Sequence, residues 1–252
     1  VHGAMCMAVS GQCLLSAQLN DRTANQGACT HPCRFEYREF EERLRPGAAT
    51  WRVAEGHDGF RAWTRFFAAN DLCLLRRLPE LAGMGVAAVK IEGRTKSASY
   101  LAQVVDAWRT ALDAVARGEG LPDACLGEVL NAATRPLGEG FWAGRPRESF
   151  AGPDPQARRR VLARLDAADG PGLFCVRAKA TWSADDPLEL LLPGLERPRI
   201  EPGDYAIQDA WGFPLPALHP GDHAWLASDH PALAAHGAGR AAPGLFLRVA
   251  AG

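Results

Sequence analysis

Hydrophobic residues recur at three- and four-residue steps along one segment near the middle of the chain. The positions are Leu101, Val104, Val105, Trp108, Leu112 and Val115. This spacing places the six side chains on one face of an amphipathic helix. Ser97 precedes the run and is a residue type that caps helix N-termini, while Gly118 follows it. We therefore predict a helix between Ser97 and Gly118.

Shorter elements are predicted on both sides of this helix. Leucines at helical spacing between Asn70 and Gly85 predict a helix; they are Leu72, Leu75, Leu78 and Leu81. Residues 86–91, apart from Lys90, are small or β-branched and predict a short buried strand. A weaker helical pattern covers residues 124–133. Helix, strand and helix in succession are typical of a parallel α/β unit.

The pattern changes from about Pro171 onward. Short apolar or alternating runs, separated by Pro, Gly and Asp, cover residues 173–179, 187–192, 204–208, 223–227 and 245–249. Strands at this spacing predict a small antiparallel barrel or sandwich. We therefore expect an α/β domain at residues 1–150, a linker at 151–170 and a small β-barrel domain at 171–252.

Four cysteines lie within the first 33 residues, at Cys6, Cys13, Cys29 and Cys33, among turn-forming residues. Four thiolates on one short irregular segment can hold a soft metal centre. The alternatives are buried free cysteines, a structural zinc site or disulfides. Zinc sites usually present two close pairs, whereas only Cys29 and Cys33 are close here. The uneven spacing favours an iron–sulfur cluster, with zinc as the alternative.

Composition places the chain in a broad class. It has 252 residues, is 47% hydrophobic and 23% charged, and contains seven cysteines, an odd number that argues against a secreted disulfide framework. No apolar run reaches the length of a membrane span, and the N-terminus does not resemble a signal peptide. We expect a cytoplasmic protein without a membrane partner. The formal net charge of −1 means that any nucleic-acid surface must be local.

Two motifs resemble a known family. Residues 3–16, with Cys6 and Cys13, and residues 25–34, with Cys29 and Cys33, are similar to the signature of the collagenase-like peptidase family U32. The segment Val89-Lys-Ile-Glu-Gly-Arg94, followed by Lys96, Ser97 and Tyr100, resembles its second hallmark. The stretch 29–37 is most similar to the branch that hydroxylates tRNA.

This resemblance implies a fold, a cofactor and an activity. Members begin with a (β/α) barrel-like domain, of which residues 1–120 resemble only the last part, so we expect this chain to lack most of that N-terminal barrel. The four cysteines are then expected to hold a 4Fe–4S cluster, with Cys73 as the alternative to Cys33. The implied reaction converts the wobble uridine of tRNA to 5-hydroxyuridine, with prephenate as the small-molecule co-substrate.

Charged residues after the predicted strand are candidates for substrate binding. They are Lys90, Glu92, Arg94 and Lys96, at the strand end where barrel enzymes place their active sites. Arg94 and Lys90 could bind a dicarboxylate or a phosphate. A salt-bridge network with Glu92 is the structural alternative. The residues that carry out catalysis are not identified by the sequence.

Two other functions stay open at this point. One is the peptidase activity in the family's name, although neither a zinc-protease helix motif nor a serine nucleophile motif occurs in the sequence. The other is a non-catalytic RNA-binding module stapled by a metal.

Overall fold

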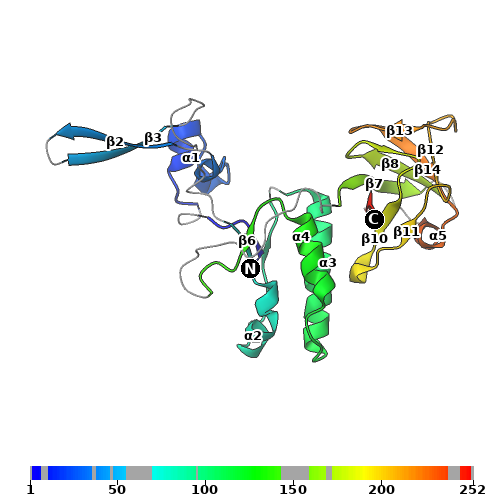
Figure 1. Cartoon of the computed structure of the whole chain (residues 1–252), viewed down its shortest axis with the longest axis horizontal. Helices are drawn as coiled ribbons and strands as arrows, with labels where there is room; N and C mark the ends of the chain where they lie inside the picture. The colour runs from blue at the N-terminus through cyan, green and yellow to red at the C-terminus, as the bar shows by residue number, and fades with distance from the viewer. Residues whose placement is uncertain are drawn as a thin grey trace.

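The computed structural model describes residues 2–6, 11–35, 38–45, 48–54, 70–94, 96–142, 159–168, 172–237 and 245–250. It is a mixed α/β protein in which helices α3 (Ala98–Ala116) and α4 (Asp123–Ala132) stand between two groups of strands. Figure 1 shows the C-terminal strands on one side of these helices and the N-terminal segments on the other. No helix among these residues is both long and apolar enough to cross a membrane.

The N-terminal part contains a small mixed sheet with strand order β5-β1-β4-β6. Its strands are very short: β1 (His2–Gly3), β4 (Asp71–Cys73), β5 (Ile91–Glu92) and β6 (Leu137–Gly138). β1 is parallel to β5 but antiparallel to β4, and β4 is parallel to β6. A regular (β/α) barrel would have only parallel pairs, so the barrel stays a prediction.

Helices α3 and α4 cover this sheet and confirm two predictions. Ser97 caps α3 by accepting a hydrogen bond from the backbone N–H of Tyr100, and Gly118 follows the helix with φ of +75°. The apolar faces of both helices and of the sheet form one buried cluster. It includes Cys73, Leu75, Leu78, Val104, Trp108, Cys125, Val129 and Leu137.

The helix predicted from Asn70 to Gly85 is only partly correct. Its first part is strand β4, which alternates buried and partly buried side chains, followed by a 3-10 turn at Leu75–Arg77. Helix α2 then spans Leu78–Gly83 and has a proline in its first turn. Because proline fits only the first turn of a helix, Pro79 defines this late start.

The buried strand predicted at residues 86–91 is also shorter than expected. Only Ile91–Glu92 pair as β5, and Val86 is 45% exposed. Of the preceding residues, Lys90 contributes its carbonyl oxygen, which accepts a hydrogen bond from the backbone N–H of His2. One α-helix and one hairpin lie between β1 and β4: α1 (Leu15–Asn20), and the hairpin of β2 (Arg38–Arg45) and β3 (Ala48–Ala54).

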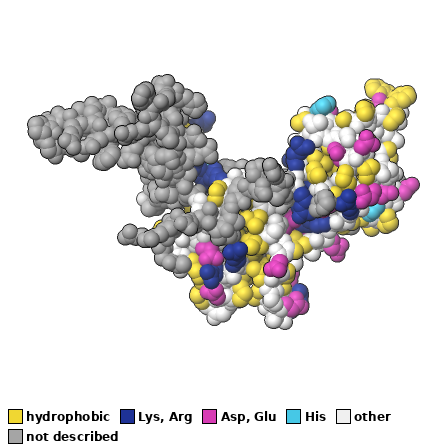
Figure 2. Space-filling view, viewed as in Figure 1, with side chains coloured by type: hydrophobic (Ala, Val, Ile, Leu, Met, Phe, Trp, Pro, Cys, Tyr) yellow, Lys and Arg dark blue, Asp and Glu magenta, His cyan; other side chains and the backbone are white. Residues whose placement is uncertain are grey.

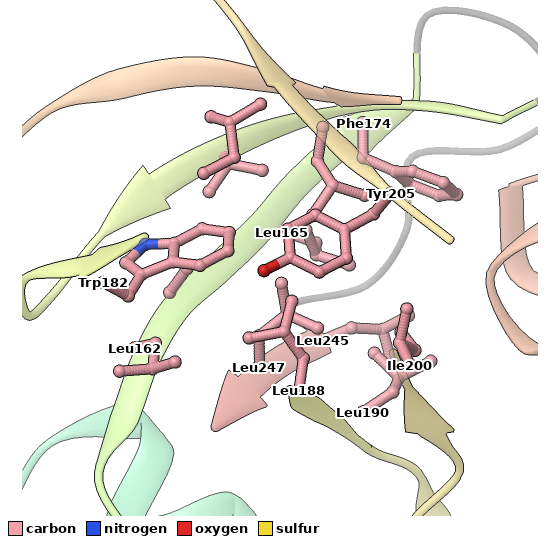
Figure 3. Close-up of a cluster of buried hydrophobic side chains, with 14 of the residues drawn as sticks. Leu162, Leu165, Phe174, Trp182, Leu188, Leu190, Ile200, Tyr205, Leu245 and Leu247 are labelled. Atoms are coloured by element: carbon pink, nitrogen blue, oxygen red, sulfur yellow. The ribbon is translucent and has the colours of Figure 1, made fainter. Parts of the chain in front are cut away.

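The C-terminal part is a curled, seven-stranded antiparallel sheet with order β11-β10-β15-β7-β8-β14-β12. The strands are β7 (Val161–Ala168), β8 (Leu173–Ala178), β10 (Leu188–Leu191), β11 (Arg199–Ile200), β12 (Ala206–Gln208), β14 (His223–Ala227) and β15 (Leu245–Val249). β9 (Trp182–Ser183) and β13 (Ala217–Leu218) form a separate pair, and α5 (Pro231–Gly237) follows β14. Figure 3 shows the hydrophobic side chains that converge inside this curl, among them Leu165, Phe174 and Trp182.

The predicted linker at 151–170 differs from the structure at its second half. β7 lies in the middle of the sheet, paired with β15 and β8, so the C-terminal domain already includes residue 161. Residues 151–158 of the predicted linker lie outside the described residues. All five predicted strand segments contain a strand, while closure of the sheet into a barrel stays a prediction.

A buried ion-pair network joins the two parts. Arg248 on β15 is fully buried and donates to Glu189 at 2.8 Å and to Glu128 of α4 at 2.8 and 3.0 Å. The same guanidinium contacts Gln103 of α3 at 3.2 Å. Arg197 adds contacts to Asp106 at 2.8 Å and to Glu128 at 3.0 Å. These bonds fix the C-terminal domain against α3 and α4.

Candidate functional site

The cysteine segment is built from short turns held by side-chain hydrogen bonds. Ser16 of α1 is buried, and its Oγ accepts from the backbone N–H of Thr30 at 3.0 Å. The Thr30 hydroxyl donates to Asn20 at 2.9 Å. His31 has a left-handed backbone with φ of 58°, and its N–H donates to the sulfur of Cys29 at 3.3 Å. The turn before Cys33 is therefore fixed relative to α1.

Of the four predicted cysteine ligands, Cys6 and Cys29 lie close enough to Cys33 to influence its ionisation. Burial raises the pKa of Cys33, the neighbouring Cys29 and Cys6 raise it further, and the Arg34 guanidinium opposes this. Cys6 is exposed, Cys13, Cys29 and Cys33 are partly exposed, and all four are free thiols. Within the described ranges, no three His, Cys, Asp or Glu side chains gather closely enough to hold a single metal ion.

Cys73 has a different environment from these four. It is fully buried on β4 rather than on a helix face, within the core beneath α3. Burial raises its pKa to about 11. A thiol in such surroundings resists forming the thiolate that binds metal, which favours Cys33 as the fourth ligand. Cys125 is also buried, in α4, and fits a structural role.

Of the four charged residues predicted to bind substrate, Arg94 and Lys96 bond residues far from them in the sequence. Arg94 donates from its guanidinium to the carbonyl oxygen of Gly27, so it ties the second hallmark motif to the cysteine segment. Lys96 is only 11% exposed and forms the ion pair described below. Lys90 is 74% exposed and lies 3.7 Å from Glu92, whose carboxylate also accepts from the backbone N–H of Arg94 at 3.2 Å.

Lys96 is the centre of a partly buried polar group that we call the Lys96–Asp71 cluster. The cluster consists of His2, Asp71, Lys96, Tyr100, Thr134 and Arg135. Lys96 Nζ donates to Asp71 at 3.0 Å and to the Thr134 hydroxyl at 2.7 Å, and lies 4.9 Å from the centre of the Tyr100 ring. Arg135 approaches the second carboxylate oxygen of Asp71 at 3.7 Å. The Tyr100 hydroxyl lies 3.2 Å from His2 Nε2.

Burial sets the electrostatics of this cluster. It lowers the pKa of His2 to about 4, so that the imidazole is neutral at pH 7, and it raises the pKa of Tyr100. His2 Nδ1, Asp71 Oδ1 and Arg135 Nη1 are buried without a hydrogen-bond partner in the described part of the chain. Buried polar atoms of this kind often mark functional sites.

The sequence alone did not identify most of this cluster. Asp71 lies in the segment predicted to be a helix, and Thr134 and Arg135 carry no recognisable motif. They meet Lys96 because β4 pairs with β6, which brings Asp71 opposite Leu137 in register. β1 and β5 are brought together in the same way, and Gly3 packs so tightly that a Cβ there would overlap the Glu92 carbonyl oxygen.

The family model and similar proteins point to the same family. The family model of Peptidase family U32 matches residues 1–151. The chain is 29% identical to the Escherichia coli "tRNA hydroxylation protein P", with 77% of this chain and 51% of that protein covered. It is 36% identical to the Helicobacter pylori protein of the same name, covering 77% of the chain and 45% of the relative. The chain thus spans about half the length of these relatives.

Other similar proteins carry different names. A Porphyromonas gingivalis "Collagenase" is 28% identical, over 57% of this chain and 36% of that protein. Among solved structures, the C-terminal domain of a Geobacillus thermoleovorans protein named as a U32 peptidase matches with a TM-score of 0.29 and 19% identity, over 37% of this chain and 94% of that one.

Proposed function

The chain belongs to Peptidase family U32, and on this premise we propose that it forms part of an iron–sulfur-dependent tRNA hydroxylase that converts the wobble uridine to 5-hydroxyuridine. The names of the relatives that cover most of the chain support the tRNA substrate. The structural observation that supports a shared site is the bond from Arg94 to Gly27. It joins the cysteine segment to the strand that leads into the Lys96–Asp71 cluster.

The four free thiols have the right chemistry for the cofactor. Cys6, Cys13, Cys29 and Cys33 would hold the cluster, because thiolate sulfur is the usual iron–sulfur ligand. Such a cluster, when bound, supplies single-electron transfer. The N–H of His31 donates to the Cys29 sulfur, and hydrogen bonds of this kind tune a cluster's reduction potential.

Next to this segment, the basic side chains suit an anionic co-substrate. Arg94 and Lys96 follow the end of β5, and Arg135 precedes the start of β6. The two guanidinium groups and the ammonium of Lys96 therefore lie toward the same end of the small sheet. A dicarboxylate such as prephenate could pair with Arg135, whose side chain is 32% exposed and which approaches Asp71 only to 3.7 Å. Asp71 would hold Lys96 in place. Its negative charge would also repel a carboxylate of the co-substrate from the Lys96 ammonium.

Anaerobic purification with iron and sulfide analysis tests the cofactor. We expect iron and acid-labile sulfide in the wild-type protein and a loss of most of both in the Cys29→Ser variant. Cys175→Ser is the matched control, since Cys175 is a partly buried thiol on β8, and it should retain both. A colourless protein with one zinc per chain would contradict the proposal.

The activity is tested in Escherichia coli cells that lack their own tRNA hydroxylation protein. Expression of the gene that encodes this chain should restore 5-hydroxyuridine, measured by mass spectrometry of digested tRNA. The Cys29→Ser and Lys96→Met variants should fail to restore it. If an iron-loaded protein yields no modified nucleoside, the proposed reaction is wrong.

Peptidase activity is the second candidate, because one relative is named a collagenase. It predicts cleavage of denatured collagen that survives replacement of Cys29. RNA binding without any modified nucleoside would instead support the non-catalytic, metal-stapled module.

A further inference from the structure

One face of the C-terminal sheet is solvent-facing and carries side chains in two cross-strand rows. Along β8 and β14, burial alternates, so that Cys175, Arg177, His223 and Trp225 point away from the core. Arg164 of β7 pairs in register with Arg177, which pairs with His223. We call the five residues Arg164, Arg177, His223, Trp225 and Gln208 the outer face.

The second row continues across the sheet. Cys175 pairs with Trp225, which pairs with Gln208 of β12. Directly opposite residues on neighbouring strands have Cβ atoms about 5 Å apart, and residues two apart on one strand are separated by roughly 7 Å. Trp225 is therefore a close neighbour of the Arg177–His223 pair. An aromatic ring, an arginine and an imidazole lie within one small patch.

A constrained turn extends this surface beyond Gln208. The Asp209 carboxylate accepts from the backbone N–H groups of Trp211 and Phe213, both at 2.9 Å, and Gly212 supplies a left-handed residue with φ of +86°. The turn holds Trp211 and Phe213 outward, with 83% and 67% of their surfaces exposed. Figure 2 shows hydrophobic side chains gathered at the upper right tip of this domain.

Large aromatics held in water by a fixed turn need a physical reason. Neighbouring tryptophan and phenylalanine side chains that a rigid turn exposes to solvent are typical of a binding surface. The arginines of the outer face are only partly neutralised: Arg164 and Arg177 are 45% and 57% exposed and share the single carboxylate of Asp166. Asp222, beside His223, is hydrogen-bonded to the backbone N–H of His219.

We propose that the outer face and the Trp211–Phe213 turn bind a single-stranded segment of RNA. Unpaired bases stack on aromatic rings whatever their sequence, and arginine and imidazole planes stack or pair with the phosphates. The identification of this RNA as the tRNA substrate rests on the proposed function. The binding chemistry of the surface is independent of that function.

Fluorescence anisotropy with the full chain and a short fluorescein-labelled, uridine-rich RNA tests this surface. Replacing Trp211 or Phe213 with alanine should weaken binding about tenfold each, the usual effect of losing one stacked base. Phe141→Ala is the matched control, because Phe141 is 69% exposed but lies in the N-terminal part. It should bind like the wild type.

Salt dependence tests the charged row separately. The Arg177→Gln variant should bind more weakly, and the slope of log affinity against log salt should become shallower by about 0.7, as expected for the loss of one phosphate contact. Arg109→Gln, an exposed arginine of α3 paired with Asp113, is the control and should leave the slope unchanged.

The outcomes separate this inference from the proposed function. Equal binding by wild type and the three surface variants, or no RNA binding at all, would overturn the inference even if 5-hydroxyuridine is formed. Conversely, Cys29→Ser should bind the labelled RNA normally. RNA binding that depends on the aromatic turn, in a protein that never modifies tRNA, would support this inference while the hydroxylase proposal fails.

Discussion

Replacing Arg248 with methionine should strongly destabilise the protein, because this arginine lies at the centre of the buried network between the two domains. Its guanidinium is fully buried and bonds both Glu128 and Glu189 at 2.8 Å. Methionine preserves much of the side-chain volume but removes the charge. Two carboxylates then remain in the interior with one cationic partner fewer.

The size of the effect follows from what remains. Removing one partner of a buried ion pair typically costs about 3–5 kcal/mol of unfolding free energy. Arg197 still contacts Glu128 at 3.0 Å, and Arg159 still contacts Glu189 at 2.8 Å. These remaining pairs place the loss at the lower end, at about 3 kcal/mol.

Urea unfolding measures this loss. With an m value of about 2–3 kcal/mol per molar for urea, the midpoint should fall by about 1 M. The exposed Arg109–Asp113 pair supplies the control, and Arg109→Met should leave the midpoint unchanged. In a double-mutant cycle, Glu128→Gln should cost less in the Arg248→Met background than in the wild type. A loss below about 1 kcal/mol for Arg248→Met would refute the reasoning.

Three further predictions concern the N-terminal part. Burial lowers the pKa of His2 from 6.5 to about 4, so between pH 4 and pH 6.5 the unfolded chain binds more protons than the folded one. The free energy of unfolding should therefore fall by up to about 3 kcal/mol as the pH drops from 6.5 to 4. Urea unfolding of the His2→Gln variant should show a smaller fall over the same pH range. Gly3→Ala should cost about 2 kcal/mol or more, since φ is +108° and a Cβ would overlap the Glu92 carbonyl, whereas Gly83→Ala, with free space around it, should be neutral or stabilising. Ser97→Ala should cost about 1 kcal/mol in thermal or urea unfolding through loss of the α3 cap, and Ser97→Asp should retain most of the stability.

Local signals account for what the sequence predicted well. Helix α3 has an apolar stripe, a capping serine and a terminal glycine, and all three act within the helix itself. Strands β14 and β15 coincide with their predicted runs. Turn residues bound β14, whose burial alternates, whereas β15 is an apolar run with four successive buried residues. β7 was missed because Leu162 and Ala163 are both buried and its register shifts near Leu165, so the two-residue alternation is interrupted.

Long-range pairing accounts for what the sequence did not predict. β1, β5 and β6 are two residues long, too short for a periodic pattern, yet they determine which side chains meet at the candidate site. Asp71 and Lys96 are 25 positions apart, and Arg248 and Glu128 are 120 apart. Such contacts depend on topology, which a single sequence does not encode in local form. Arg94 and Lys96 of the hallmark motif bond Gly27 and Asp71, while their role in substrate binding stays a prediction.

Helix α3 connects the two proposed functions physically. Its first turn holds Tyr100 of the Lys96–Asp71 cluster, and Gln103 and Asp106 on the same helix contact Arg248 and Arg197. At 1.5 Å per residue, these contacts lie within about 10 Å of Tyr100 along the helix axis. An RNA that touches both the outer face and the cysteine segment therefore depends on the angle at which this network holds the C-terminal domain. The Arg248→Met variant, assayed below its unfolding transition, should hydroxylate less tRNA than the wild type, while its iron content and its binding of the short RNA stay normal. Equal hydroxylation by the variant and the wild type would show that the domain contact does not position the RNA.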